Sequence, residues 1–352
     1  MKIQILAFLA AFLFCISCNN DDSTLQEKTA SYDVYLGGVD EFKACYWKNG
    51  QQTFVQGGEN LMGTKIIVDN NDVYLFGTNV DKIDPKPAWY FWKNGVKHNV
   101  AEYLNAGADD EFAIYSDMIV HNGDIYFLGK ATNPSSTSSQ DKYQYCYWKN
   151  GIKTVLETYG SGSSVRLSGG IEVFNNIVYT SIRKNIDLSN YPTVTWDLGY
   201  YNNNTYYTLF NTDKLLPHKF INDPSNPSQI YMITKTNAYT LSISSIKNIT
   251  SGNDIQIPAN IAQNGISQVY FEGSDKYYIG KDFYYKNNTL VSINNANGFN
   301  DIGQFTVKDQ NIYTTRYNPN QTSVKFYIND VETQSLPNIM RGCFNSIFVV
   351  KK

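Results

Sequence analysis

Short runs of alternating apolar and polar residues follow one another along this chain, separated by tight polar turns. The runs are four to six residues long, are rich in Val, Ile, Thr, Tyr and Phe, and end at Gly, Asn or Asp. Examples are Gln52–Val55, Thr64–Val68 and Asp72–Gly77. This period and these residue types predict β-strands joined by turns.

One strand pattern recurs along the whole chain. It reads Asp-Val-Tyr-Leu-Gly-Gly at Asp33–Gly38, and close variants stand at Asp72–Gly77 and Asp124–Gly129. Weaker copies centre on Tyr179, Tyr231, Tyr277, Tyr313 and Phe348, so that eight copies define seven periods of 35–53 residues. Self-similarity at such a period predicts a repeat architecture.

A turn pattern recurs with the same spacing. Trp-Lys-Asn-Gly stands at Trp47–Gly50, Trp92–Gly95 and Trp148–Gly151. Asn-Gly between alternating residues predicts a type I′ hairpin turn, which needs positive φ at both central positions. Decayed copies in which Asn or Asp replaces Gly keep this turn chemistry, and they lie at Tyr200–Asn204, Tyr284–Asn288 and Phe326–Asp330, whereas the fifth unit, near Ala238–Ser245, has no clear copy.

Each unit therefore contains four short strands, here lettered A to D. Four strands per unit, repeated seven times, predict an all-β fold, a β-propeller. The pattern resembles degenerate kelch-type blades, in which a hydrophobic strand ends in glycine and a Tyr and a Trp follow. We expect seven blades, with six or eight as alternatives, in a single domain over residues 32–352. The chain ends with a predicted A–B pair, Gly342–Phe344 and Ile347–Val350, which we expect to complete a blade with the N-terminal strands.

The N-terminus has the features of a targeting segment. Lys2 precedes an apolar run, Ile5–Ile16, which is too short to span a bilayer and has the length of a signal-peptide core. The run ends in a small residue and then Cys18, which resembles a bacterial lipoprotein signal. That resemblance implies that residues 1–18 are the signal peptide and that Cys18 carries palmitate and becomes the first residue; ordinary secretory cleavage is the alternative.

The residues after Cys18 refine the expected location. Asp21 and Asp22 resemble the surface-export signal of Bacteroidetes lipoproteins. The resemblance implies an outer-membrane lipoprotein of the cell envelope, exposed at the surface. Residues 19–31 are polar and charged, and we interpret them as a flexible tether.

Composition excludes some functions and leaves others open. Charged residues make up 17% of the chain and the net charge is −3, which disfavours nucleic-acid binding because that requires a clustered basic surface. The chain has 28 Tyr residues, most of which we expect to pack between blades, while a few form rigid platforms for sugars or peptides. Beyond the leader, Cys45, Cys146 and Cys343 are expected to remain unpaired, the first two as small buried hydrophobes.

No catalytic signature stands out. The three histidines, His98, His121 and His218, have no metal-ligand spacing. There is no nucleophile elbow, phosphate loop, zinc-protease motif or sialidase box. We therefore expect no cofactor, no metal and no catalytic residue that the sequence can identify, although carboxylate pairs of glycosidase type cannot be recognised from sequence.

Loop lengths point to one face of the propeller. Because neighbouring strands alternate in direction, A–B and C–D turns share one face and B–C and D–A loops share the other. All the long insertions fall in the second group, and loops on a rigid scaffold commonly carry function. These insertions are Thr78–Pro87, Lys130–Lys142, Lys184–Thr195, Gln56–Gly63, Tyr103–Phe112 and Tyr159–Gly170.

The rim of this long-loop face supplies the candidate ligand-binding residues. They are Asp81, Asp84, Lys86, Trp89, Asp109, Asp110, Glu111, Arg166, Tyr191 and Trp196. Trp89 is extra to the repeat, three residues before Trp92, so it either packs against a neighbouring blade or forms an exposed stacking platform. The acidic run at 109–111 is either a solvated loop or a calcium site. The repeated Trp47, Trp92 and Trp148 are expected to be structural.

These features favour a lipid-anchored β-propeller that binds a glycan, a peptide or an envelope protein without chemistry. The alternative is a surface polysaccharide hydrolase or lyase that uses carboxylates such as Asp81, Asp84, Asp109 or Glu111. A third hypothesis is a structural member of an envelope complex, which a large apolar surface patch would support.

Overall fold

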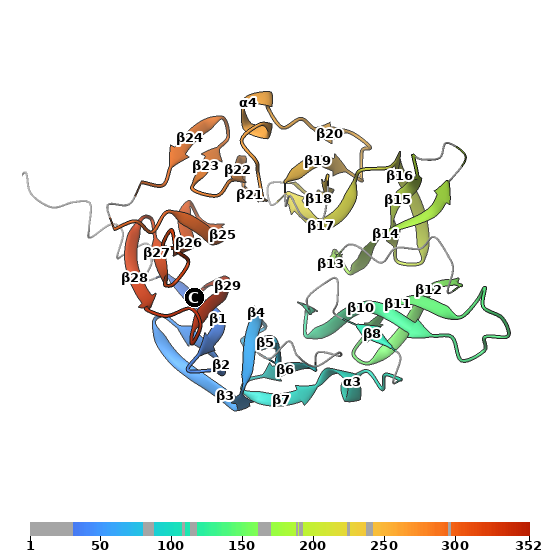
Figure 1. The fold of residues 1–352 in the computed structure, drawn as a ribbon, viewed down its shortest axis with the longest axis horizontal. Coiled ribbons are helices and arrows are strands. Elements are labelled where there is room, and N and C mark those ends of the chain that lie inside the picture. Colours follow the sequence, from blue (N-terminus) through green and yellow to red (C-terminus); the bar gives the residue numbers. More distant parts are fainter. Residues whose placement is uncertain are drawn as a thin grey trace, which may run out of the picture.

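The computed structural model is a ring of seven antiparallel sheets around a central axis, the β-propeller that the repeats predict (Figure 1). It describes residues 31–79, 88–107, 110–112, 118–160, 170–187, 189, 193–223, 226–236, 242–294 and 297–352. Among these residues no helix is long and apolar enough to cross a membrane. The seven-blade prediction is confirmed.

Each blade is a sheet whose strands follow one another from the central axis outward. In the first blade the strands, innermost first, are β29 (Cys343–Lys351), β1 (Tyr32–Asp40), β2 (Lys43–Lys48) and β3 (Gln51–Glu59). In the second blade they are β4 (Leu61–Asp69), β5 (Asp72–Asn79), β6 (Trp89–Lys93) and β7 (Val96–Asn99). In the third blade they are β8 (Glu111–Phe112) with β9 (Ile119–His121), then β10 (Asp124–Thr132), β11 (Tyr143–Lys149) and β12 (Ile152–Tyr159). In the third blade, β8 and β9 both pair with β10 and together take the place of the innermost strand.

The remaining four blades keep the same order, and two single-turn helices lie in connections. The fourth blade has β13 (Ile171–Phe174), β14 (Ile177–Asp187), β15 (Thr195–Asn202) and β16 (Thr205–Thr212), and the fifth has β17 (Leu216–Asp223), β18 (Asn226–Lys235), β19 (Ile243–Asn248) and β20 (Asp254–Ile255). The sixth blade has β21 (Gln268–Glu272), β22 (Asp275–Ile279), β23 (Phe283–Lys286) and β24 (Thr289–Ser292). The seventh has β25 (Asp301–Lys308), β26 (Asn311–Tyr317), β27 (Val324–Ile328) and β28 (Val331–Leu336). The helices are α3 (Val100–Tyr103) and α4 (Ala259–Ala262).

The two ends of the chain close the ring in one sheet. β29 lies innermost in the first blade and pairs antiparallel with β1, with Phe348 opposite Tyr35. Closure by the terminal strands is thus confirmed, but the predicted A–B pair is wrong, because the C-terminal residues form one continuous strand. The supposed eighth copy of the pattern at Phe348 is an innermost strand that resembles the pattern only because it is equally apolar.

The two repeated sequence patterns are two halves of one structural unit. In the first blade, the Asn49 side chain accepts a hydrogen bond from the Val34 amide at 2.8 Å and donates one to Asp33 at 2.8 Å. The Lys48 ammonium lies 2.8 Å from the same carboxylate. The C–D turn is thereby tied to the start of strand B, across the blade. We call this arrangement the Asp–Lys–Asn unit.

The Asp–Lys–Asn unit recurs in three further blades. The Asn-to-Asp hydrogen bonds are 2.7, 2.6 and 3.0 Å long and the Lys–Asp ion pairs 2.8, 2.7 and 3.0 Å; the units are Asp72–Lys93–Asn94, Asp124–Lys149–Asn150 and Asp275–Lys286–Asn287. The Asn residues have φ of 50–55°, and Gly95 and Gly151 have φ of 82° and 78°. Both values lie in the left-handed region that Asn and Gly tolerate, so the predicted turn chemistry is confirmed.

The other two decayed copies keep the backbone contact, and no ion pair of this kind is seen in them among the described residues. Asn203 accepts from the Val178 amide at 3.2 Å, and Asn329 accepts from the Ile312 amide at 2.8 Å. In the fifth blade, where the sequence shows no copy, the Thr250 hydroxyl takes this role and accepts from the Ile230 amide at 3.2 Å. A hydrogen bond from an amide of strand B to a side chain of the C–D turn is therefore present in all seven blades.

The hydrophobic core is seven separate layers, one between each pair of neighbouring blades. Each repeated tryptophan packs toward the preceding blade: Trp92 is fully buried against Tyr35, Leu61 and Leu75. Its Nε1 donates to the carbonyl of Gln56 in the first blade at 2.8 Å. The structural reading of Trp47, Trp92 and Trp148 is confirmed by their exposures of 3%, 0% and 2%.

The cysteines and the glycines that end the repeated strand also serve packing. Cys45 and Cys146 are buried and, like Cys343, free. A Cβ at Gly38 would lie 2.0 Å from the carbonyl oxygen of Cys343, and one at Gly77 would lie 2.3 Å from that of Met62. Since no side chain fits at such distances, glycine allows the innermost strand to approach strand B.

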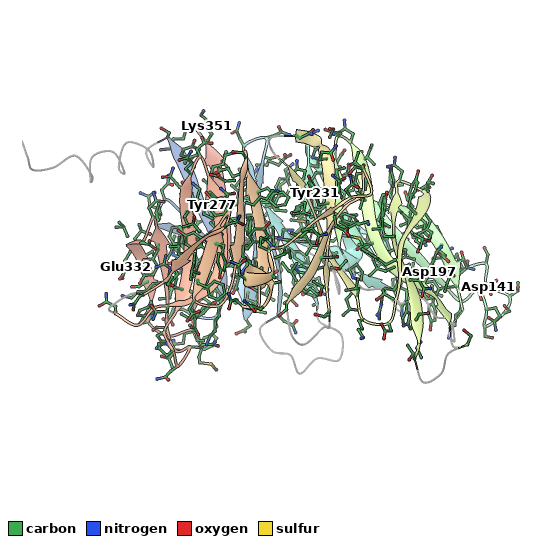
Figure 2. All side chains as sticks on the ribbon, turned by 90° about the horizontal axis from the view of Figure 1, so that it is seen from above. Asp141, Asp197, Tyr231, Tyr277, Glu332 and Lys351 are labelled. Atoms are coloured by element: carbon green, nitrogen blue, oxygen red, sulfur yellow. The ribbon has the colours of Figure 1, made fainter. Side chains whose placement is uncertain are left out.

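One predicted insertion does not exist. β3 runs to Glu59 and β4 begins at Leu61, so only Asn60, at φ 57°, separates them. The prediction of a long loop over Gln56–Gly63 is therefore wrong, because its polar and glycine-rich residues continue the outermost strand. Figure 2 views the ring from its edge, with Lys351, at the end of β29, on the upper side.

The first prediction concerns the blade interface. Trp92→Ala should lower the free energy of unfolding by about 3–5 kcal/mol, as large aromatic truncations in cores do, because it opens a cavity and breaks the bond to Gln56. Urea unfolding followed by tryptophan fluorescence and circular dichroism measures this. Val96→Ala, on the exposed strand β7 of the same blade, is the matched control. An unchanged unfolding midpoint for Trp92→Ala would contradict the assignment.

The second prediction concerns pH. The Lys48 ammonium beside Asp33 holds the pKa of that carboxyl below its ordinary value, and Lys93 and Lys149 do the same for Asp72 and Asp124. A carboxyl with a lowered folded-state pKa contributes stability above its ordinary pKa of about 3.9, and this is lost as pH falls through the lowered value.

A variant with Lys48→Gln, Lys93→Gln and Lys149→Gln should therefore be less stable than the native chain at pH 6. The difference should shrink as pH falls toward 2, because protonation of the three carboxyls removes their attraction to the lysines. Urea midpoints measured across this range test the prediction, with the exposed Lys308→Gln as control. A difference that stays constant with pH would refute it.

Candidate functional site

Most of the predicted rim residues lie outside the part of the chain that the structure describes. These residues are Asp81, Asp84, Lys86, Asp109, Arg166 and Tyr191. The predicted lipidation site, Cys18, also lies outside the described residues. For Glu111 the structure describes the backbone, as part of β8, and not the side chain. Their assignment to a ligand site stays a prediction.

Trp89 packs inside its own blade. Its ring stacks on Phe76 with the centroids 5.1 Å apart and the planes 5° from parallel. It contacts the core layer between the second and third blades, on the opposite side of the sheet from Trp92, as strand alternation predicts. The side chain is partly buried, and one face of its ring packs against Phe76.

Asp110 and Trp196 also have intramolecular partners. Asp110 accepts hydrogen bonds from the Gly107 amide at 3.0 Å and the Thr132 amide at 2.8 Å, one on each carboxylate oxygen. Trp196 is 8% exposed, and the Arg183 guanidinium lies 5.1 Å from its ring. The described part of the rim therefore consists of side chains that hold loops and blades in place.

A more open group of polar side chains lies on the central axis. A cavity of about 370 Å³ is enclosed by the innermost strands of the sixth, seventh, first and second blades. Its polar lining residues are Thr64, Lys65, Tyr270, Gln304, Asn345 and Ser346. All of these but Ser346 are partly exposed, which fits a channel that reaches solvent.

β-Bulges aim the polar side chains of this central channel. Four innermost strands carry one extra residue relative to strand B, and the extra residues are Thr64, His218, Asn345 and one of the pair Gly303–Gln304. Each bulge lies in the first half of its strand, toward the long-loop face. A bulge bends the strand and redirects the side chains next to it, so the four together form a polar ring at one level of the channel.

Side chains in this ring bridge neighbouring blades. Asn345 donates to the carbonyl of Gly63 at 2.7 Å, and Gln268 donates to the carbonyl of Gly303 at 3.1 Å. The Ser346 hydroxyl accepts from the Ile66 amide at 2.8 Å. The innermost strands are thus fastened to one another, which fixes the width of the channel at this level.

Lys219 follows the bulge at His218 on β17. Its ammonium lies 4.9 Å from the centre of the Tyr270 ring, on the next blade. Burial lowers the pKa of Lys219 to about 8, although Glu172 opposes this; burial lowers the pKa of the neighbouring His218 to about 3 and raises that of Tyr270 to about 12. His218 is therefore uncharged at neutral pH, and the lysine supplies the charge.

Five described carboxyl groups have a perturbed pKa. Every described carboxyl whose pKa departs from its ordinary value is lowered, and these are Asp33, Asp72, Asp124, Asp141 and Asp275. Among the residues described, no group of three or more His, Cys, Asp or Glu side chains is placed to hold a metal ion. Hydrogen-bond donors and positive charge, rather than paired carboxylates, characterise the channel.

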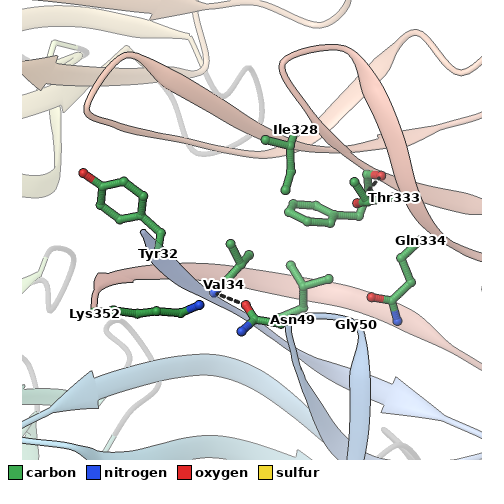
Figure 3. Close-up of a pocket in the computed structure, with 10 residues that line it drawn as sticks. Tyr32, Val34, Asn49, Gly50, Ile328, Thr333, Gln334 and Lys352 are labelled. Carbon is green, nitrogen blue, oxygen red and sulfur yellow. Dashed lines mark hydrogen bonds between the residues drawn. The ribbon is translucent and has the colours of Figure 1, made fainter. Parts of the chain in front are cut away.

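A second cavity, also of about 370 Å³, lies at the closing seam between the first and seventh blades (Figure 3). Its wall is mainly apolar, with Val34, Leu36 and Phe326, and Lys352 stands at one end. Asn49 lines it as well, but its side-chain oxygen already accepts the Val34 amide. Because the wall of this cavity is mainly apolar, whereas the channel wall carries amide, hydroxyl and ammonium groups, we take the channel as the candidate site.

Sequence reasoning missed the channel because bulges leave no mark in composition. A weak signal does exist: Thr64-Lys65-Ile66-Ile67 and His218-Lys219-Phe220-Ile221 both place a lysine between a polar residue and an apolar pair. In both strands the lysine pairs with the residue two after the repeated aromatic of strand B. Aligning the innermost strands, and not only the repeated patterns, would have brought the two lysines to one level.

Comparison with known proteins supports the fold and goes no further. No protein-family model and no curated protein matches the sequence. Among solved structures, uncomplexed acylaminoacyl peptidase from Pyrococcus horikoshii is similar with a TM-score of 0.51 and 10% identity, over 86% of this chain and 50% of that one. This chain therefore spans about half the length of the peptidase.

Two similar structures of comparable length have lower scores. A putative 6-phosphogluconolactonase from Bacteroides uniformis has a TM-score of 0.46 at 10% identity, over 91% of this chain and 100% of that one. AztD from Citrobacter koseri has a TM-score of 0.44 at 10% identity, over 91% and 97%. At such scores and identities, these two similarities say nothing about the ligand or the role of this chain.

Proposed function

We propose that this chain is a non-catalytic binding module of the cell envelope, whose ligand enters the central channel from the long-loop face. The observation that carries this proposal is the cavity of about 370 Å³ on the propeller axis, with partly exposed amide, hydroxyl and ammonium groups in its wall. Binding sites are typically concave cavities of roughly 300–1,000 Å³ with a few convergent polar groups.

The polar lining supports binding over hydrolysis. Glycosidases need two carboxyl groups about 5–10 Å apart, one of them with a raised pKa. The described cavity has amides, hydroxyls and one lysine, Lys65, in its wall. Lys219, on β17, contacts the lining residue Tyr270 and has Glu172 as a nearby carboxylate. The alternative hypothesis uses rim carboxylates. Asp81, Asp84 and Asp109 lie outside the described residues, as does the side chain of Glu111, so these groups do not bear on this comparison.

The envelope location rests on the N-terminal sequence. The lipoprotein-like signal ending at Cys18 and the polar residues 19–31 would anchor the propeller to a membrane through a tether. The described domain begins at residue 31, and β1 follows at once. In this proposal the tether places a rigid propeller outside the membrane, where glycans, peptides or envelope proteins reach the channel.

The third prediction tests binding and turnover together. The domain from Ser31 onward, applied to arrays of glycans and peptides with the reducing ends or termini monitored, should bind a ligand without converting it. Gln304→Ala, which removes an amide from the channel wall, should raise Kd by about 2- to 10-fold, as the loss of one hydrogen bond of about 0.5–1.5 kcal/mol implies.

Trp89→Ala is the matched rim variant and should bind like the native domain. Turnover of the ligand would overturn the non-catalytic proposal. Loss of binding in Trp89→Ala with none in Gln304→Ala would move the site to the rim.

The fourth prediction concerns the anchor. In cells expressing the full chain and fed a clickable palmitate analogue, the protein should carry the label and sediment with membranes. Cys18→Ser should lose both the label and the sedimentation, whereas Cys15→Ser should keep them. Label retained in Cys18→Ser would refute the lipidation site.

A further inference from the structure

Two lysines stand at one level of the innermost strands, on different sides of the central channel. Lys65 stands on β4 in the second blade and Lys219 on β17 in the fifth, at the same level relative to strand B. These strands lie on different sides of the axis (Figure 1). The Lys65 charge is close enough to contribute to the lowered pKa of Lys219, as is the charge of Lys235 on β18.

Two lysines and one carboxylate act on the charge of Lys219. Glu172, on β13, is the carboxylate that favours its charged form, against Lys65 and Lys235. Among the ion pairs of the described residues Lys219 takes no part, and its ammonium contacts the face of the Tyr270 ring instead. A charged group that is surrounded by protein and lacks an ion-pair partner is costly, and a bound anion would relieve this cost.

We infer that the channel is a recognition site for the carboxylate of an acidic saccharide, with Lys219 and Lys65 as the groups that bind the anion. This inference rests on the proposed function, since it names the ligand class of the same channel. Lys219 would bind the carboxylate from one wall and Lys65 from the other. No chemical step is involved, and the ligand leaves unchanged.

The rest of the wall fits a hydroxyl-rich ligand better than an acidic peptide. The Gln304 amide can both donate and accept hydrogen bonds, while the Thr64 hydroxyl and the Asn345 amide, which already donate to the carbonyls of Phe76 and Gly63, present acceptor oxygens to sugar hydroxyls. An acidic peptide would need further cations or an open sheet edge, and the innermost strands are joined to one another by Asn345, Gln268 and Ser346. A volume of about 370 Å³ admits a small oligosaccharide segment and not a folded partner.

Binding should depend on pH through Lys219. Glu172, Lys235, Lys65 and Tyr270 face it from neighbouring strands, while His218 on its own strand is neutral. Because burial lowers the pKa of Lys219 to about 8, the ammonium is present at pH 7 and mostly lost at pH 9.5. Affinity for an anion should therefore fall over this interval.

The experiment is calorimetric titration of the whole propeller domain with trigalacturonate, neutral galactotriose and triglutamate at pH 7 and pH 9.5. We expect trigalacturonate to bind at pH 7 at least 10-fold more tightly than the other two, and to weaken several-fold at pH 9.5. Lys219→Met should weaken binding roughly 10-fold or more, as loss of a hydrogen bond to a charged group does. Lys308→Met, an exposed lysine at the far end of an innermost strand, is the matched control.

Lys219→Arg separates charge from shape. Arginine stays protonated throughout this pH range, so this variant should bind trigalacturonate at pH 7 and lose most of the pH dependence. Unfolding midpoints of all variants show whether each is folded.

Three outcomes would overturn the inference. Equal affinity for trigalacturonate and galactotriose, with no effect of Lys219→Met, would remove the charge recognition and leave the proposed binding function standing. Tighter binding of triglutamate would replace the saccharide with a peptide. Absence of trigalacturonate binding, while the array screen identifies another ligand, would refute the ligand class alone.

Discussion

The side chain at the end of each C–D turn that accepts a backbone amide of strand B is the contact on which the rest of the structure depends. Six blades use Asn for it and one uses Thr250. The bond links the third strand to the second at the turn, so it sets the register of the blade. Register in turn decides which side chains enter the core layers between blades, because a slip of one residue would reverse both faces.

Closure of the ring imposes a second constraint, and the channel follows from it. The innermost strand of the first blade comes from the C-terminus and all others precede their own strand B. Seven innermost strands with side chains directed at their neighbours leave a space on the axis that no blade fills. Bulges at Thr64, His218 and Asn345 each add one polar residue to an innermost strand beside this space. The polar bridges of Asn345 and Gln268 keep that space open by fixing the distance between strands.

The sequence predicted the elements that local chemistry determines. Asn49-Gly50 and its copies specify a turn through their own backbone preferences, and the Asp–Val–Tyr pattern specifies the strand that the turn is tied to. The end of β3 was misplaced because Gly57 and Gly58 look like a loop, whereas pairing of Glu59 with Lys43 keeps the strand intact. Phe348 was taken for strand B because an innermost strand and its neighbour are equally apolar, and only pairing tells them apart.

The candidate site was beyond sequence reasoning for a physical reason. Lys65 and Lys219 are separated by more than 150 residues in the chain and come to one level around the axis only because the ring closes with seven blades. With a different number of blades, the same two residues would not have this placement around one channel. Their joint role, unlike that of the turn, is therefore a property of the ring as a whole. A site of this kind depends on the correct register of every blade, and that register is set by the contact between the C–D turn and strand B.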